Sequence, residues 1–556
     1  MRKAVWGAAL GMVALSAAAH AEGAKPTPVP AAQKPGFDQI READLRADLT
    51  FLASDALLGR MSLQPGDDAA VQWIAAEFAK AGLQPGATDA KGAPSWYQMV
   101  PLVEYRPNPA ANGLTLRIGT AEQSWKAPDV LGGYRDDVDL TAPLVFAGYG
   151  ITAPGVGYDD YKGVDVRGKV VLVFEHEPQE NDPASRFNGT GNTRHATNRV
   201  KALNAQAHGA LAVLVVAEPN RKHPSNLERV NRIGGSARRV PPLPGQALPD
   251  DELRIPVLTV SDAVGAALLA KAGMTPQALQ SVIDAGLAPQ SRALAETSVA
   301  LHLENTSRTR GVSANVVGLL PGSDPTLAPE TVIISAHHDH DGSNTGNGGP
   351  EIWHGADDNG SGTVGVVALA RAFMAHPVKP KRSILFAVFA AEERGLLGSY
   401  YMAMHPLRPL ATTRAMINFD MIGRNEEASD QTTGLIEIPK DTTNRLNLIG
   451  ATYSPDFNRA VQAANRSIGL DLDDRFDHEN ALNVFFRSDQ FPFVLKDVPA
   501  MWFNTGFHPD YHHTTDTADR INYPKMTKIV KLAYLSAWRF ASEAAPPAFV
   551  PDPAGH

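Results

Sequence analysis

The chain has 556 residues, of which 43% are hydrophobic and 20% charged, a composition that excludes a wholly disordered chain, a collagen and a coiled coil. Because a single core stops growing at about 250–300 residues, this length predicts at least two folded units. The formal net charge of −9 and the lack of a basic run argue against a nucleic-acid partner. The sequence contains no Cys, which excludes disulfides, thiolate metal sites and a cysteine nucleophile.

The first segment has the pattern of a secretory signal peptide. Arg2 and Lys3 precede an apolar run over residues 4–19, and Ala19-His20-Ala21 fits a small-x-small cleavage site. The run is shorter than the roughly 20 residues that span a bilayer. We therefore expect residues 1–21 to be removed, and we expect a periplasmic or extracellular protein with no stable membrane anchor. Residues 22–36 are rich in Pro and Ala and are predicted to form a linker.

The rest of the chain divides into three regions that differ in predicted secondary structure. Helical spacing of apolar residues predicts helices near residues 45–52 and over 69–83, with Gly82 as a stop signal. Short β-rich runs follow at 144–147, 169–174, 212–216 and 255–260, separated by long polar loops at 177–193 and 218–251. From residue 314, apolar strands at 331–335, 383–390 and 415–419 alternate with a helix at 363–375.

This order predicts an α/β domain that is interrupted by a β-rich insert. We assign the first part of the α/β domain to residues 37–140, the insert to 141–305 and the main part of the α/β domain to 306–545. A Pro-rich tail follows at 546–556.

Histidines and carboxylates follow the predicted strands of the α/β domain, where open α/β sheets bind ligands. Imidazole and carboxylate suit zinc, and several carboxylates together suit two divalent ions that share a bridging group. The clusters are His337-His338-Asp339-His340-Asp341, Asp357-Asp358, Glu392-Glu393, Asp420, and His512-His513 with Asp510 and Asp516.

The ordered motifs resemble those of the M28 metallopeptidases, the aminopeptidase-like co-catalytic dizinc group, with an inserted protease-associated (PA) domain. The five metal motifs correspond to residues 335–340 (SAHHDH), 355–362 (GADDNGSG), 391–393 (AEE), 419–423 (FDMIG) and 511–517. Residues 51–60 (FLASDALLGR) resemble the N-terminal motif of the family, and 144–151 (LVFAGYGI) resemble the entrance to the insert. The resemblance implies a mixed, mostly parallel central sheet flanked by helices, of the zinc-aminopeptidase (phosphorylase/hydrolase-like) type, with a β-rich PA insert.

The resemblance also implies a site with two Zn²⁺ ions, for which Co²⁺ or Mn²⁺ are possible substitutes. His337, Asp358 and Asp420 hold one ion, and Asp358, Glu393 and His512 hold the other, so that Asp358 bridges. In the family a cis peptide bond follows the bridging aspartate.

Two further carboxylates receive catalytic roles from the resemblance. Glu392 is the general base, and Asp339 orients the imidazole of His337. His338 competes with His337 as the ligand and His513 competes with His512; the family spacing favours His337 and His512. Because adjacent residues of an extended chain point to opposite sides, we expect a kink after Ala391 that turns both glutamates inward.

The implied function is that of a secreted dizinc aminopeptidase, which removes N-terminal residues from peptide substrates with a metal-activated water. One alternative is a glutaminyl cyclase-type zinc transferase of the same fold, which works with one zinc. Another is a non-catalytic PA-domain binding protein, whose family relatives have lost metal ligands. The number of zinc ions per chain separates the peptidase from the cyclase.

Overall fold

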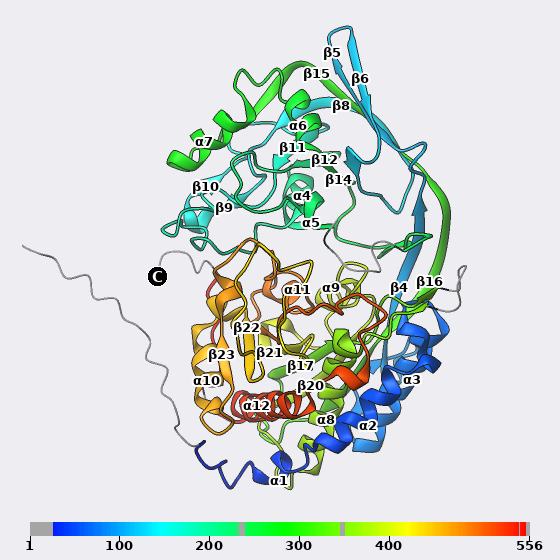
Figure 1. Ribbon diagram of the computed structural model, residues 1–556, viewed down its shortest axis with the longest axis vertical. Coiled ribbons are helices and arrows are strands. Elements are labelled where there is room, and N and C mark those ends of the chain that lie inside the picture. The colour runs from blue at the N-terminus through cyan, green and yellow to red at the C-terminus, as the bar shows by residue number, and fades with distance from the viewer. Residues whose placement is uncertain (1–25, 231, 233–238, 345–350, 544, 552–556) are drawn as a thin grey trace, which may run out of the picture.

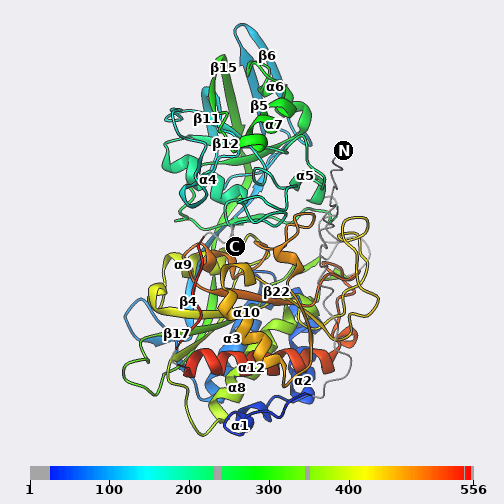
Figure 2. The ribbon, with the colours of Figure 1, turned by 90° about the vertical axis from the view of Figure 1, so that its left-hand side faces the viewer.

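The computed structural model describes residues 26–230, 232, 239–344, 351–543 and 545–551. The predicted signal peptide, residues 1–21, lies outside the described residues. Two bodies are stacked along the long axis of the molecule: a main domain, which contains both chain ends of the described part, and an insert above it (Figure 1 and Figure 2). Among the described residues, no helix combines the length and apolarity needed to cross a membrane.

The main domain is built on a ten-stranded sheet whose central strands β20, β17, β21 and β24 are parallel neighbours. The strands run in the order β13-β4-β16-β20-β17-β21-β24-β22-β23, and β1 pairs with β16. Their bounds are β1 Gln84–Pro85, β4 Tyr97–Pro107, β13 Gly245–Ala247, β16 Asn305–Leu320, β17 Thr331–His337, β20 Ser383–Phe389, β21 Thr413–Phe419, β22 Arg445–Ile449, β23 Asp471–Asp473 and β24 Ala500–Asn504.

Helices cover both faces of this sheet. Because side chains alternate along a strand, Ile334 and Phe386 pack into one core while Ile333 and Leu385 pack into the other. This double burial explains the continuous apolar runs of the predicted strands. One face carries α1 Lys34–Phe37, α2 Glu42–Leu52, α3 Pro65–Ala81, α8 Gly362–Ala375, α10 Pro455–Asn465 and α12 Tyr523–Ser542, and the other carries α9 Leu397–Met404 and α11 Phe491–Val494.

The predicted helices and strands of the main domain are confirmed with small shifts of their ends. The helix expected over 69–83 is α3, and Gly82 ends it with a left-handed φ of 92°. The helix expected over 363–375 begins one residue earlier, at Gly362. The strand expected over 331–335 extends to His337, so that the first histidine of the cluster is part of β17 itself.

The insert contains its own eight-stranded sheet in the order β6-β5-β15-β8-β11-β12-β14-β7. The segment β8-β11-β12-β14 is parallel, with α4 on one face and α6 and α7 on the other. The bounds are β5 Gly113–Ile118, β6 Ala121–Trp125, β7 Val130–Leu131, β8 Val138–Phe146, β11 Val170–Phe174, β12 Ala212–Val216, β14 Val257–Val260, β15 Arg292–Leu303, α4 Asn198–Ala207, α5 Asn226–Val230, α6 Asp262–Leu268 and α7 Pro276–Gly286. Apart from the two large sheets, the described residues form three two-stranded sheets: β2 Ala87–Thr88 with β3 Pro94–Ser95, β9 Thr152–Ala153 with β10 Tyr158–Asp159, and β18 Ser343–Asn344 with β19 Glu351–Ile352.

The boundary expected at residue 141 differs from the extent of the insert's sheet. Strands β5, β6 and β7 precede residue 141 and yet belong to that sheet, while β13 lies within 141–305 and pairs with β4 of the main sheet. The cause is a ribbon of two long antiparallel strands, β4 and β16, which runs from the main sheet up to the insert (Figure 1). The chain leaves the main domain through β4 and returns through β16, so the change of domain occurs near Pro107 and Asn305.

The two segments predicted as a linker and a tail lie against the main domain where they are described. The backbone N–H of Thr27 donates to the carbonyl of Arg466 at 2.8 Å. Near the other end, the ring of Phe549 stacks on Tyr453 with a centroid distance of 5.5 Å. Both segments therefore contribute contacts to the folded domain.

The doubly buried central strands make the core sensitive to truncation. Phe386 on β20 is fully buried and contacts the rings of Phe78 and Phe373. Phe386→Ala is expected to lower the free energy of unfolding by about 3–5 kcal/mol, because it leaves a cavity. Urea unfolding measures this loss. Phe51→Ala, at a side chain that is 43% exposed, is the matched control; an equal loss in both variants would contradict the packing described here.

Candidate metal centre

Four neighbouring parallel strands deliver their polar side chains to one edge of the main sheet. His337 ends β17, Glu392 and Glu393 follow β20, and Asp420 comes directly after β21. His512 lies in the segment that follows β24. Strand order β20-β17-β21-β24 makes these ends adjacent, so residues far apart in sequence converge at the position where α/β sheets bind ligands.

The first donor group is formed by His337, Asp358 and Asp420. His337 Nε2 lies 3.4 Å from Asp358 Oδ1 and 3.7 Å from Asp420 Oδ2. All three residues are buried, and within the described part of the chain Nε2 of His337 makes no hydrogen bond. Ser488 Oγ donates to Asp420 Oδ2 at 2.5 Å, which fixes that carboxylate.

The second donor group uses the other oxygen of Asp358. His512 Nε2 lies 3.3 Å from Asp358 Oδ2 and 3.5 Å from Glu393 Oε2. Asp358 therefore faces one group with each oxygen. Burial by itself raises the pKa of Asp358, but the imidazoles of His337 and His512 outweigh it and hold that pKa well below its usual range.

His340 and Asp341, to which the sequence pattern assigns no role, contact members of the second donor group. His340 Nδ1 lies 2.7 Å from Glu393 Oε1, and Asp341 Oδ2 lies 2.6 Å from His512 Nδ1. The Asp341 carboxylate also pairs with Arg394. A carboxylate on the far side of a ligand imidazole sets its tautomer and orientation. The sequence indicated His340 and Asp341 only by their position soon after β17. Which of these side chains turns toward the site depends on the path of the loop.

Asp339 holds the turn that carries both glutamates. Its carboxylate accepts the backbone N–H of Glu392 at 2.9 Å and of Glu393 at 3.3 Å. The chain turns there because Ala391 has a left-handed φ of 53°, which is the kink expected after β20. His337 Nδ1 lies 3.2 Å from the main-chain oxygen of Asp339 and 3.7 Å from its carboxylate. Orientation of the His337 ring thus comes from the backbone of Asp339.

Glu392 stands beside the first donor group without being part of it. Its Oε2 lies 3.7 Å from His337 Nε2. Burial raises the pKa of Glu392 well above its usual range, and the charges of Asp420 and Asp489 add to that rise while His337 opposes it. A carboxyl group held in this environment is suited to exchange a proton with a neighbouring molecule.

The two competing histidines point away from both donor groups. His338 Nδ1 lies 2.9 Å from Asp67 Oδ1, and its Nε2 lies 3.0 Å from the carbonyl oxygen of Ala314. His513 Nδ1 lies 2.8 Å from the carbonyl oxygen of Tyr511. The structure therefore brings His337 and His512 into the donor groups, as the spacing favoured.

The segment around Asp358 is held from two sides. The Asp358–Asn359 peptide bond is cis, as the resemblance implied. The carboxylate of Asp516 accepts the backbone N–H of Asp357 and of Asp358 at 3.0–3.1 Å. This contact gives a structural role to the aspartate that follows His512 by four residues.

Arg60, the last residue of the N-terminal motif, fastens the loops beneath the site. Its buried guanidinium donates to four carbonyl oxygens at 2.7–2.8 Å. Burial lowers the pKa of Arg60 to about 10. The acceptors are the carbonyl groups of Leu52, His338, His354 and Gly355. One buried cation thus joins α2 to the loops that precede Asp358 and follow His337.

The donor set fits zinc. Each group supplies imidazole nitrogen and carboxylate oxygen, without sulfur, from residues that are buried except for the half-buried Glu393. This is a combination that zinc binds. The buried Nε2 atoms of His337 and His340 make no hydrogen bond to described residues, and buried polar atoms of this kind call for a partner. The fold and the site thus define the class of protein: an α/β protein with a candidate metal centre at adjacent strand ends.

Comparison with known proteins agrees with this class. Residues 315–536 match the model of peptidase family M28, and residues 140–268 match the model of the PA domain. One segment of the chain is thus similar to peptidase family M28, and another is similar to the PA domain.

One curated relative is a "Probable zinc metalloprotease" of Pyrenophora teres f. teres, which is 40% identical over 19% of this chain and 24% of that protein. Another is "Aminopeptidase YwaD" of Bacillus subtilis, which is 25% identical over 53% of this chain and 47% of that protein. The chain thus spans less than half the length of these two relatives. Among solved structures, an aminopeptidase from Aneurinibacillus sp. strain AM-1 aligns with 93% of this chain and 98% of its own at 20% identity, with a TM-score of 0.47.

Arg60→Met is expected to lower the free energy of unfolding by at least about 3 kcal/mol, because several buried carbonyl groups lose a charged donor at once. The same variant should bind zinc more weakly, since the loops on either side of the donor groups are released. Thermal unfolding and zinc titration measure the two effects. Arg41→Met, at an exposed arginine, is the control, for which a change within about 0.5 kcal/mol is expected. Unchanged zinc binding in Arg60→Met would show that Arg60 does not organise the site.

Proposed function

We propose that this protein is a zinc-dependent aminopeptidase that holds two zinc ions and removes N-terminal residues from peptides. The observation that carries the proposal is the placement of Asp358, whose two oxygens face two separate donor groups. A shared carboxylate is the arrangement that two-metal hydrolases use. The match of residues 315–536 to peptidase family M28 supports the peptidase chemistry. The relative named as an aminopeptidase supports action at the N-terminal end of the substrate.

In this proposal His337 and Asp420 hold one ion, Glu393 and His512 hold the other, and Asp358 contacts both. Zinc at these donors supplies a Lewis acid that polarises a peptide carbonyl group. Asp341 orients His512, and Ser488 orients Asp420. Their hydrogen bonds keep the donor groups in place before a substrate arrives.

Glu392 is proposed to transfer a proton from the attacking water to the leaving amine. It is held by the hydrogen bond from its own backbone N–H to Asp339, and its carboxyl group lies next to His337. From there it accepts a proton from the attacking water and returns it to the leaving amine, as general acid–base catalysis of amide hydrolysis requires.

A cavity of about 250 Å³, lined by residues of the insert and of the main domain, offers room for part of a substrate. Arg487 is in its wall and donates to the hydroxyl oxygen of Tyr511, the residue before His512, at 3.2 Å. The insert supplies Asn226, Arg229 and Arg232 to the same wall. The PA insert is thereby proposed to shape substrate access as well as to cover the main domain.

Glu392→Gln is expected to reduce the rate of release of amino acids from N-terminal amide substrates by about 10²–10⁴-fold, because the proton acceptor is lost. Zinc content should stay at the level of the unaltered protein, since Glu392 is outside the donor groups. Glu427→Gln, at an exposed glutamate, should retain full activity. Full activity in Glu392→Gln would refute the assigned role.

Zinc content separates a dizinc peptidase from a one-zinc transferase. Asp358→Asn is expected to lose both ions of the candidate metal centre, because each donor group loses its shared oxygen. Metal analysis of the purified protein, before and after the substitution, gives the number lost. A loss of one zinc per chain would favour the glutaminyl cyclase type of chemistry. In the unaltered protein, activity should disappear with a chelator and return with zinc.

A further inference from the structure

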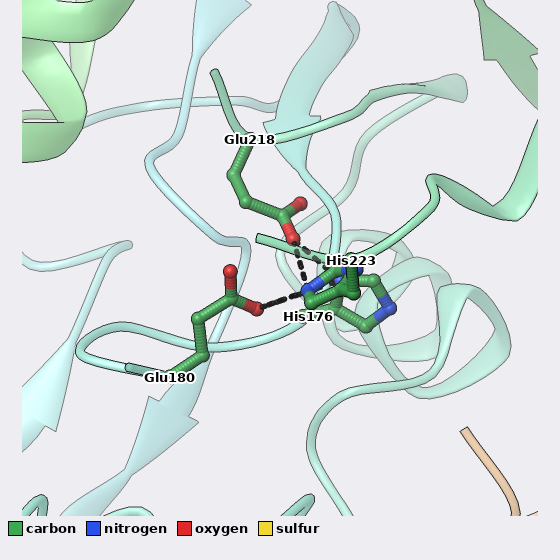
Figure 3. Close-up of side chains that lie close together, drawn as sticks. All are labelled: His176, Glu180, Glu218 and His223. Atoms are coloured by element: carbon green, nitrogen blue, oxygen red, sulfur yellow. Dashed lines mark hydrogen bonds and ion pairs between the residues drawn. The ribbon is translucent and has the colours of Figure 1, made fainter. Parts of the chain in front are cut away.

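A second cluster of histidines and glutamates lies inside the insert, outside the candidate metal centre. It consists of His176, Glu180, Glu218 and His223, which point toward one another (Figure 3). All four residues are buried: Glu218 has no exposed surface, and His176, Glu180 and His223 expose 1%, 5% and 7% of theirs. No feature of the family match or of the proposed peptidase chemistry uses these four residues, which we call the insert cluster.

The fold of the insert explains why these residues meet. The parallel strands β11 and β12 are neighbours, and they end at Phe174 and Val216. His176 and Glu218 each lie two residues beyond those ends. The two long polar loops noted in the sequence, 177–193 and 218–251, then bring in Glu180 and His223. The insert therefore repeats the rule of the main sheet, in which polar groups gather beyond the carboxyl ends of parallel strands.

The separations within the insert cluster fit one small cation. His176 Nδ1 lies 2.6 Å from Glu218 Oε1 and 3.7 Å from Glu180 Oε2. His223 Nε2 lies 2.9 Å from Glu180 Oε2 and 3.3 Å from Glu218 Oε1. Ligand atoms at zinc bond lengths in a tetrahedron are about 3.4 Å apart, and the four separations lie on both sides of that value.

Two carboxylate oxygens in the insert cluster have no hydrogen bond. Glu180 Oε1 and Glu218 Oε2 are buried and without a partner among the described residues. The ion pairs found for these two carboxylates in the described chain go only to His176 and His223. Nearby Lys201 is turned elsewhere, since its Nζ donates to the carbonyl oxygens of Tyr149 and His176. Buried carboxylates without a compensating cation are costly, and a divalent ion removes that cost.

We propose that the insert cluster is a structural zinc site, in which His176 Nδ1, Glu180 Oε2, Glu218 Oε1 and His223 Nε2 bind one ion. Two imidazoles and two carboxylates suit zinc. Four protein ligands complete a tetrahedron and leave no position for a substrate, which is the mark of a structural site.

Arg229 is a positively charged neighbour of the insert cluster, so its contacts must be compatible with a bound cation. Its guanidinium lies 3.1 Å from His176 Nε2 and 3.1 Å from His223 Nδ1, the outer nitrogens of the two rings. A metal on the inner nitrogens places N–H groups on the outer ones. Arg229 does not depend on the rings, because it also donates to Ala481 and Asn480.

The outer nitrogen of His223 faces an acceptor for its N–H group, and the outer nitrogen of His176 faces a side-chain amide. His223 Nδ1 lies 2.9 Å from the carbonyl oxygen of Pro224. His176 Nε2 lies 2.6 Å from Nδ2 of Asn483. Rotation of that amide would bring its oxygen, which accepts from Asn192, to this position. A hydrogen bond from the far nitrogen of a ligand imidazole to a carbonyl or an amide oxygen is the usual support of a zinc-bound histidine.

The position of the insert cluster indicates what the ion stabilises. Both loops contact the main domain. In the first, Asn188 donates to the carbonyl of Asp477 at 2.9 Å and Thr190 donates to the carbonyl of His478 at 2.7 Å. In the second, Arg229 donates to the carbonyl of Asn480 at 2.8 Å. The contacted segment continues to Ser488, which holds Asp420 of the candidate metal centre. Zinc in the insert cluster would thus keep both loops in the shape that seats the insert on the main domain.

The test is zinc content per chain of the full-length protein, measured by elemental analysis after metal removal and dialysis against micromolar zinc chloride. Glu218→Gln is expected to hold one zinc fewer than the unaltered protein. Glu177→Gln is the matched control, because Glu177 is equally buried and close in sequence but accepts from the backbone N–H of Thr193 at 2.9 Å. It should lose no zinc. Circular dichroism reports whether each variant is folded.

The deciding quantity is the difference of one ion, which does not depend on how many ions the candidate metal centre holds. Equal zinc content in folded Glu218→Gln and in the unaltered protein overturns the proposal. If Glu218→Gln does not fold, Asp358→Asn decides: with the candidate metal centre emptied, one tightly bound zinc should remain, and none remaining overturns the proposal. Peptidase activity is measured separately, so a failure of the proposed function and a failure of the insert site give different results.

Discussion

The charge of Asp358 is the constraint on which the arrangement of the main domain depends. A buried carboxylate between two imidazoles is stable only if both oxygens keep a partner, and His337 and His512 supply one each. The backbone around it is equally constrained, because Asp516 accepts the N–H of Asp358 and Arg60 holds the carbonyl of Gly355. Helix α2, the end of β17 and the segment after β24 are thus organised around one side chain.

Much of this organisation could be predicted from the sequence. The central strands are continuous apolar runs because both their faces are buried, and the donors follow them directly, so their convergence follows from the parallel order. His337 and His512 needed family spacing as well, since His338 and His513 are chemically equal. The structure distinguishes His337 from His338 by their contacts, because the ring of His338 contacts Asp67 and the carbonyl of Ala314.

Other features depend on contacts that a sequence pattern does not contain. The roles of His340 and Asp341 follow from the path of one loop, which turns each side chain toward a partner more than fifty residues away. Glu180 and His223 reach the insert cluster from loops whose composition predicts only exposure to solvent. The expected boundary at residue 141 missed β5, β6 and β7, because short polar strands such as β6 carry little apolar signal.

The long ribbon of β4 and β16 also has a consequence for the history of this architecture. Pro107 and Asn305 are paired across the ribbon at the point where the chain passes into the insert. A tight turn between those two positions would close the ribbon as an ordinary hairpin, so a whole domain could be gained or lost there without a change in the register of the main sheet. Loss would also remove β13 and leave β4 as an unpaired edge. A shortened protein would then need charged residues or a new cover along that strand to prevent pairing with other strands.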